Sequence, residues 1–500
     1  MDRGRSFQAV MATVRGGALA PPAGRPVLSR WLGTRWLYLP CLIGAAGVGM
    51  ASTLFPLQAL LVLVVVLVVA AVWRWPVLAG YLVVGLTPLT AGINRGSALP
   101  LLRPNEAIDL LVGVALVARG LYRLRSGELP RLRLGAVEVA LLLLAVCSSV
   151  VPLASMAVRQ QPITSDDLLY ALVLWKYLGL YALIRLSVST DQGVRRCLWI
   201  SVGAASVVAV LAILQSLGLF GVPRILADYY APYGYIDAYS ARGSSTLGLP
   251  AATGDLMIFN LAIVTGFWLR YHRHRLLLAG VAALLIVATL STGEFSSAIG
   301  LLCGIACIIA VTNSARLLKF AVPAAVLAVL VLQPVITTRL SGFQSVSGLP
   351  VSWTGRLQNL DNYFWPQLFS NWNFVLGVRP SARIALSTQG TGYVWIESGY
   401  TWLLWGGGLP LLGSFIFFVA AAAKRGWQAA RRNLGAVSIA GAATFVAVLV
   451  VTVMMIFDPH LTYRGSADAM FILLALAVPV RRGFSEAPVG AIPGHSAEEV

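Results

Sequence analysis

The run AVSIAGAATFVAVLVVTVMMIF, residues 436–457, decides the fold class of this chain. It contains no charged side chain, and its polar residues are only serine and threonine. An α-helix of roughly 20 apolar residues is long enough to cross the hydrocarbon core of a membrane, which is about 30 Å thick. The sequence therefore predicts that this run is a membrane-spanning helix.

Comparable apolar runs recur on both sides of it, from Trp36 to Val480. Hydrophobic residues make up 58% of the chain and charged residues only 11%. The hydrophobic fraction is too high, and the charged fraction too low, for a soluble domain with a polar surface. We expect an all-α, polytopic transmembrane helix bundle of about 12 to 14 spans with one large extracytoplasmic loop. The expected spans lie near 36–51, 54–72, 76–92, 105–119, 134–152, 167–186, 195–219, 251–269, 276–291, 295–311, 317–334, 398–422, 436–457 and 467–480.

The net charge of +18 would suggest a nucleic-acid partner in a soluble protein. Here the basic residues lie mainly in short connectors on alternate sides of the spans, where they set membrane topology. This pattern predicts cytoplasmic termini and no nucleic-acid partner. The expected parts are a disordered basic tail at 1–35, a bundle at 36–334, an outer loop at 335–397, further spans at 398–482 and a second tail at 483–500.

Motifs for cofactors and metals are missing from the sequence. It shows no glycine-rich nucleotide-binding motif and no metal-ligand spacing, so we expect neither a cofactor nor a metal site. The five cysteines lie in apolar segments or at their ends, which suggests no disulfide framework. Cys303 and Cys307 share one expected helix, where close packing of small residues explains them.

A polar segment from Thr337 to Glu397 interrupts the apolar pattern. Connections of this length in compact proteins are usually working parts, such as lids, binding surfaces or catalytic loops. Its basic residues are candidates for binding an anionic substrate: Arg339, Arg356, Arg379 and Arg383.

Within this segment, Trp353–Trp365 has the pattern of a short amphipathic helix. Leu357, Leu360 and Phe364 recur at helical spacing, and Pro366 disfavours helix at the residue before it. Such a helix is expected to lie on the outer membrane surface, a location suited to a lipid-linked substrate. A passive cap over the bundle is the alternative.

Glu397 ends the polar segment and opens an expected span, with Tyr393 and Tyr400 nearby. Partial burial raises the pKa of a carboxylate towards the range in which a general base works best. Glu397 is therefore a candidate base for a sugar hydroxyl, and the tyrosines are candidates for substrate contact. The alternative is a salt bridge between Glu397 and Arg383 or Arg379.

The loop Phe220–Pro250 combines several tyrosines, Tyr239 among them, with Arg242. Aromatic faces pack against sugar rings and a guanidinium binds phosphate with two hydrogen bonds, so the pattern suits a sugar phosphate. An interfacial aromatic belt with an arginine is the alternative interpretation of the tyrosines.

Two further places carry ionisable groups. Lys176 lies near the middle of an expected span and needs a partner, which Glu106 or Asp109 could supply; direct substrate contact is the alternative. His460 and Arg464 lie in a polar turn between two spans. His460 is a candidate base, and a solvated turn is the alternative.

Four stretches, taken in order, carry a family resemblance: RGSSTLGLPAATGDL (242–256), LSTGEFSSAIGLL (290–302), TGRLQNLDNYFWPQL (354–368) with LGVRPS (376–381), and ESGYTWLLWGGGLPLLG (397–413). On this expected topology they resemble the O-antigen ligase and polysaccharide polymerase superfamily of bacterial multispanning membrane proteins. The resemblance implies a location in the bacterial cytoplasmic membrane and a role in building envelope polysaccharide.

The resemblance also implies roles for individual residues. Arg242 and Arg356 match the arginines that grip the pyrophosphate of an undecaprenyl-linked glycan. Glu397 with Ser398 stands where the ligases carry a histidine followed by asparagine, serine or glutamine, and Gly408 and Leu409 follow at the corresponding distance. A carboxylate there favours a polymerase over a ligase.

A second departure from the family pattern is the sequence Glu294, Phe295 and Ser296, which replaces the usual serine–arginine pair.

Together these observations predict a metal-independent glycosyltransferase with Glu397, Arg356 and Arg242 as catalytic residues. Its expected partners are an undecaprenyl-pyrophosphate-linked glycan, a glycan or lipid acceptor, and membrane lipids. The rival hypothesis is a transporter or flippase for lipid-linked or amphipathic solutes, which would need internal repeats and polar residues at mid-membrane depth in both halves.

Overall fold

The computed structural model describes residues 56–94, 102–125, 134–230, 242–271, 274–314, 330, 333, 337, 351–385, 392–433 and 435–478. Both tails, the expected span near 36–51, Tyr239 and Arg339 lie outside these residues. The chain divides into two compact units, Met1–Leu67 and Val68–Val500. The first unit contributes only the start of helix α2 (Pro56–Arg74) to the described residues.

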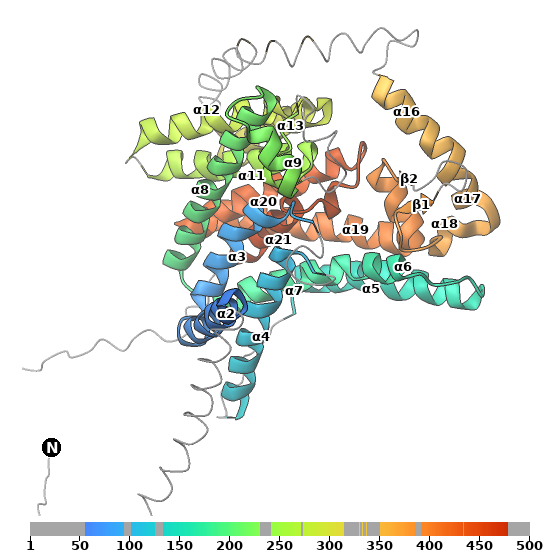
Figure 1. The fold of residues 1–500 in the computed structure, drawn as a ribbon, viewed down its shortest axis with the longest axis horizontal. Coiled ribbons are helices and arrows are strands. Elements are labelled where there is room, and N and C mark those ends of the chain that lie inside the picture. The colour runs from blue at the N-terminus through green and yellow to red at the C-terminus, as the bar shows by residue number, and fades with distance from the viewer. Residues whose placement is uncertain are drawn as a thin grey trace, which may run out of the picture. The chain divides into compact units, whose positions relative to one another are not determined.

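Helices make up most of the second unit (Figure 1). Its main helices are α3 (Val77–Thr90), α4 (Pro104–Arg125), α5 (Ala136–Val158), α6 (Ser165–Ala171), α7 (Val173–Ser187), α8 (Asp191–Ser216), α9 (Val222–Tyr230), α11 (Pro250–Arg270), α12 (Arg275–Ser291), α13 (Phe295–Thr312), α19 (Gly399–Arg432), α20 (Ala436–Met454) and α21 (Ser466–Leu476).

Seven helical segments among the described residues are long and apolar enough to cross a membrane. They are Ala136–Val158, Ser165–Ser187, Asp191–Ser216, Pro250–Arg270, Phe295–Thr312, Gly399–Arg432 and Ala436–Met454. Shorter apolar helices occupy four more of the expected spans, at Ala59–Arg74, Val77–Thr90, Arg275–Ser291 and Ser466–Leu476. The chain therefore has the helices of a multi-pass membrane protein, as the apolar runs predict.

Helix α11 lies at the centre of the second unit. Of its most apolar window, 89% is buried inside the protein, and α8, α12, α13, α20 and α21 pack around it. Its sequence is apolar all round rather than on one stripe, which is the pattern of a fully surrounded helix. The polar residues near its N-terminus are thereby enclosed by other helices.

Helix α19 is the longest of the described helices, and it packs along both α20 and α5 (Figure 1). It bends at Gly408, whose backbone angles of φ 64° and ψ −156° are not helical. The bend brings the helix against the polar segment, where Trp405 O accepts hydrogen bonds from Val378 N at 2.7 Å and Arg379 N at 3.3 Å.

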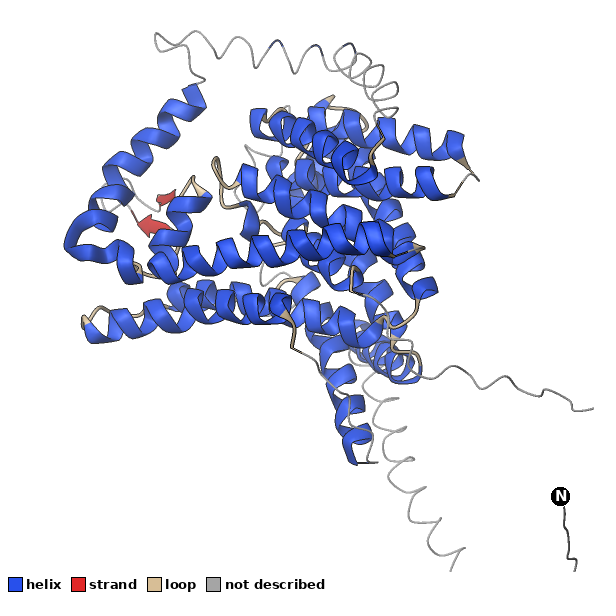
Figure 2. Ribbon diagram, turned by 180° about the vertical axis from the view of Figure 1, so that it is seen from behind, coloured by secondary structure: helices blue, strands red, loops and turns tan. Residues whose placement is uncertain are grey.

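The described part of the polar segment has its own secondary structure. It forms α16 (Val351–Asn359), a π-helical turn (Leu360–Phe364), α17 (Trp365–Phe369), a 3₁₀ turn (Ser370–Trp372) and α18 (Asn373–Leu376). Strands β1 (Arg383–Ala385) and β2 (Tyr393–Trp395) then pair antiparallel, with Ile384 opposite Val394, beside these helices (Figure 2).

The helix expected at Trp353–Trp365 is present, but its end was predicted wrongly. The helical path continues to Phe369, because Pro366 occupies the first turn of α17, where the missing N–H has no helical partner to lose. The apolar face is only partly confirmed: Leu360 and Phe364 are buried, whereas Leu357 is 53% exposed.

Candidate functional site

Arg356 is the centre of the charged groups in the polar segment. Its Nη1 donates to Asp458 Oδ2 at 2.6 Å and to the carbonyl of Phe457 at 3.4 Å. Its Nε lies 4.0 Å from Glu397 Oε1. The helix α16, the turn after α20 and the segment just before α19 therefore meet at this guanidinium.

Glu397 lies immediately before Ser398, whose side chain caps the N-terminus of α19. Asn359 Nδ2 donates to Glu397 Oε2 at 3.2 Å, so α16 holds the carboxylate from a second side. The alternative of a salt bridge to Arg379 or Arg383 is wrong, because those arginines bind other carboxylates. At 32% exposure, the side chain of Glu397 is more accessible than that of Asp458, at 10%.

Arg242 forms an ion pair with Glu294, with Nη1 3.1 Å from Oε1. The next residue is fixed as well, since Gly243 N donates to the carbonyl of Ser291 at 3.0 Å. Glu294 is the N-cap residue of α13, and its charge acts on both Arg356 and Asp458. We refer to Arg242, Glu294, Arg356, Glu397 and Asp458 as the arginine–carboxylate cluster.

His460 lies in the same turn as Asp458, two residues further along the chain. Its Nδ1 lies 2.7 Å from Asp255 Oδ2, near the N-terminus of α11, and its side chain is fully buried. The alternative of a solvated turn is therefore wrong for His460. Its Nε2 is buried and has no hydrogen-bond partner among the described residues, and its ring packs 4.6 Å from that of Tyr463.

Burial and charge set the protonation states in the cluster. Burial lowers the pKa of Arg356, but the carboxylates of Asp458 and Glu397 raise it more, so the guanidinium stays charged. Burial raises the pKa of Asp458 above its ordinary value although Arg356 opposes this. Burial also raises the pKa of the Tyr463 phenol well above its ordinary value, which keeps it neutral.

Arg379 and Arg383 fasten the polar segment to the start of α6. Arg379 donates to both oxygens of Asp167, from Nε at 3.0 Å and from Nη2 at 2.6 Å. Arg383 Nε donates to Asp166 Oδ2 at 2.7 Å, and its guanidinium lies 4.1 Å from the ring of Tyr393. These contacts give both arginines, and Tyr393, a structural role.

Lys176 pairs with a carboxylate other than those expected. Its Nζ lies 2.7 Å from Asp468 Oδ1, at the start of α21. The prediction that it needs a partner holds, but the partner is neither Glu106 nor Asp109. Arg464 acts electrostatically on Tyr177, the neighbour of Lys176. Lys176, Asp468 and Arg464 form a second charged region, which does not include Arg356 or Glu397.

Tyr400 is half-buried in the first turn of α19. Its hydroxyl donates to the carbonyl of Thr452 at 2.8 Å, which ties α19 to α20. Tyr400 lies three positions after Glu397 in the sequence, but its hydroxyl proton is donated to Thr452 and not to a substrate.

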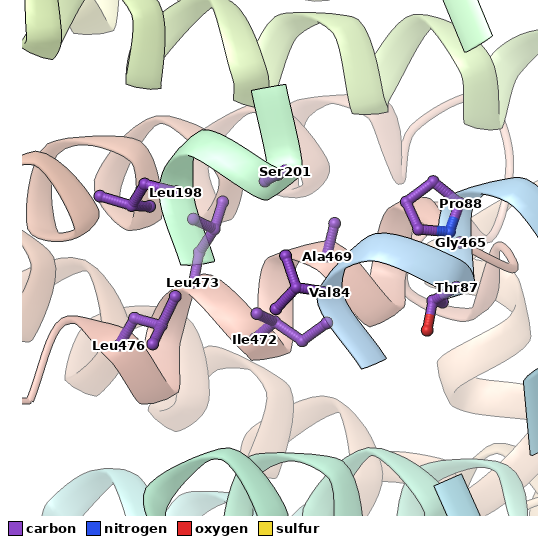
Figure 3. Close-up of a pocket in the computed structure, with 10 residues that line it drawn as sticks. All are labelled: Val84, Thr87, Pro88, Leu198, Ser201, Gly465, Ala469, Ile472, Leu473 and Leu476. Atoms are coloured by element: carbon purple, nitrogen blue, oxygen red, sulfur yellow. The ribbon is translucent and has the colours of Figure 1, made fainter. Parts of the chain in front are cut away.

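A small pocket lies elsewhere, between α3, α8 and α21 (Figure 3). Aliphatic side chains such as Val84, Leu198 and Ile472 line it, with Thr87 and Ser201 as its polar groups. None of its lining residues belongs to the arginine–carboxylate cluster. It therefore offers apolar space but no group for acid–base chemistry.

Comparison with known proteins adds no identity. No family model, no curated protein and no solved structure matches this chain. Among the described residues, no group of three or more histidine, cysteine, aspartate or glutamate side chains could hold a metal ion.

Sequence reasoning missed three acidic members of the site. Glu294, Asp458 and Asp255 are each bound to a basic group that lies 52, 102 and 205 positions away along the chain, respectively. The usable signal was the presence of a carboxylate at the end of an apolar run, where ionisable groups need partners. The partner itself could not be read from spacing.

Proposed function

We propose that this protein is a glycosyltransferase of the polymerase or ligase type, acting on a lipid-linked glycan at the surface of a membrane. The observation that carries the proposal is the position of Arg356 between Asp458 and Glu397. A permanently charged guanidinium next to a partly accessible carboxylate joins an anion-binding group with a candidate base.

In the proposed reaction, a hydroxyl oxygen of the acceptor sugar attacks the anomeric carbon of the donor glycan. Glu397 takes the hydroxyl proton as the new glycosidic bond forms. The bond between the anomeric carbon and the pyrophosphate oxygen breaks at the same time, and the lipid pyrophosphate leaves with the bonding electron pair. Arg356 and Arg242 would stabilise the charge that develops on this leaving group.

The resting cluster has three carboxylates for two guanidinium groups. A pyrophosphate must therefore replace a carboxylate at each arginine that it binds. Arg242 is suited to this exchange, because its side chain is 37% exposed and its partner Glu294 is 18% exposed. The raised pKa of Asp458 suits the exchange at Arg356, because a protonated Asp458 releases the guanidinium.

Reconstitution with an undecaprenyl-pyrophosphate-linked glycan tests the proposal. We expect wild-type protein to form longer or transferred product, and Glu397→Gln and Arg356→Ala to lose at least about 100-fold in rate, as expected when a general base or a charge-stabilising group is removed. Asp361→Asn and Arg195→Ala are matched controls, since both side chains are exposed and lie outside the cluster. Full activity of both cluster variants would refute the assignment of the site.

A transporter of lipid-linked solutes is the second candidate. The observation that favours it is the Lys176–Asp468 ion pair within the helices, because charged groups among membrane helices often mark transport pathways. In the same vesicles, movement of the glycan across the bilayer without chain growth would support transport and count against glycosyl transfer.

A further inference from the structure

A second group of ionisable side chains lies between α4, α7 and α21. Lys176 on α7 contributes the cation, and its Nζ lies 2.7 Å from Asp468 Oδ1. Asp468 is fully buried, and its Oδ2 accepts a hydrogen bond from Gly465 N at 2.8 Å. Asp468 therefore lies against the ammonium of Lys176 at Oδ1 and against a backbone N–H at Oδ2.

Asp109 on α4 is the unusual member. Both of its carboxyl oxygens are buried, and neither has a hydrogen-bond partner among the described residues. The charged groups that act on it are Lys176, Asp468 and Glu106. Glu106 has its own ion pair with Arg103 at 3.3 Å, and Lys176 is the basic group that acts on both Asp109 and Asp468.

The charge balance decides the state of Asp109. An ionised carboxylate that is buried without hydrogen bonds and lies near a second carboxylate is unfavourable, because it loses its hydration and the second charge repels it. A bound proton removes both the desolvation cost and the repulsion. A metal ion is a poor substitute, because the ammonium of Lys176 would repel it and the described residues contain no group of three or more histidine, cysteine, aspartate or glutamate side chains that could hold one.

We propose that Asp109, Lys176 and Asp468 form a buried proton-binding site in which Asp109 carries the proton. The site is distinct from the arginine–carboxylate cluster and goes beyond the proposed glycosyl transfer. Helix α3, which also packs on α4, carries no acidic or basic residue, so it offers no further charge to Asp109. Loss of the proton places a second negative charge beside the Lys176–Asp468 ion pair and loosens the packing of α4 and α21 on α7.

Infrared spectroscopy of the reconstituted full chain tests the proposal directly. We expect a carbonyl band of a protonated carboxylic acid at neutral pH in the wild type and in the control Asp361→Asn, which removes an exposed carboxyl group. The contribution of Asp109 should be lost in Asp109→Asn, so the band should weaken relative to the wild type. A band of unchanged intensity in a folded Asp109→Asn protein, or the absence of any band from the wild type, would overturn the assignment.

Thermal unfolding gives an independent readout. Asparagine resembles a protonated aspartate, so Asp109→Asn should leave the melting temperature close to that of the wild type at neutral pH. Asp468→Asn should lower it by several degrees, because it leaves the ammonium of Lys176 without its bound carboxylate. An equal loss in both variants would mean that Asp109 is ionised in the fold and would refute the proton site. Neither outcome depends on glycosyl transfer.

Discussion

The bend of α19 at Gly408 gives a sharp test of how the polar segment is held. Its angles, φ 64° and ψ −156°, lie in a region that is open essentially only to glycine. A Cβ atom at this position would stand 2.3 Å from the carbonyl oxygen of Val375 and 2.6 Å from Leu376 N. These are backbone atoms of α18, so no side-chain rotation can remove the clash.

The expected cost of Gly408→Ala follows from these two effects. Backbone strain contributes about 1–3 kcal/mol. Displacement of packed atoms contributes a further amount of about 1–3 kcal/mol. We therefore expect a loss of at least about 2 kcal/mol, accompanied by movement of α18 away from α19.

Gly413→Ala is the matched control on the same helix. A Cβ there meets no atom within 4 Å, and Gly413 does not have a positive φ. Alanine in a helix interior is more favourable than glycine by up to about 1 kcal/mol, so this variant should be as stable as the wild type or more so.

Thermal unfolding and limited proteolysis of the purified proteins measure both effects. Gly408→Ala should melt at a lower temperature and be cut faster between α18 and β1. If Gly408→Ala and Gly413→Ala melt at the same temperature, the bend and its contact with Val375 do not hold the segment, and the reasoning fails.

Two further predictions concern the turn after α20. Because burial raises the pKa of Asp458, its contribution to stability is present at low pH and is lost as pH rises above the ordinary aspartate value of about 4. The melting temperature of the wild type relative to Asp458→Asn should therefore fall over that rise; a relative increase would show that Arg356 dominates instead. The second prediction concerns the buried pair of His460 and Asp255. A double-mutant cycle of His460→Gln and Asp255→Asn, measured by thermal unfolding, should give a coupling free energy of about 1–3 kcal/mol. Additive effects of the two substitutions would contradict the contact.

The helices were predictable because burial in a membrane imposes a simple rule on sequence. Helices α11 and α20 coincide closely with the apolar runs near 251–269 and 436–457. Where the apolar signal is weaker, the rule says less. Helix α4 forms where a span was expected, but it carries Glu106 and Asp109 and is not among the helices that meet the criteria for a span.

The partners of the charged residues were not predictable in the same way. A salt bridge from Glu397 to Arg383 or Arg379 was the alternative to its role as a base, but Glu397 lies beside Arg356. Lys176 was expected to bind a residue of α4, yet α21 supplies Asp468. The sequence offers several carboxylates as partners for each basic residue. The packing of the helices decides which of them lies within reach, and spacing along the sequence does not show this.

The described part of the polar segment is held by ion pairs to the rest of the protein, which does not suit a freely moving lid. Its arginines divide by role: Arg379 and Arg383 bind the carboxylates of Asp167 and Asp166, whereas Arg356 faces the turn that carries Asp458.

Between these ion pairs, the backbone of Val378 is bound to the bent part of α19 at Trp405. A segment held at α6, at α19 and at the turn after α20 keeps Arg356 and Glu397 in a fixed relation. For the proposed transfer reaction, this fixed relation favours a preorganised site. The pyrophosphate of the substrate would replace carboxylates at the arginines, and no lid would have to close over it.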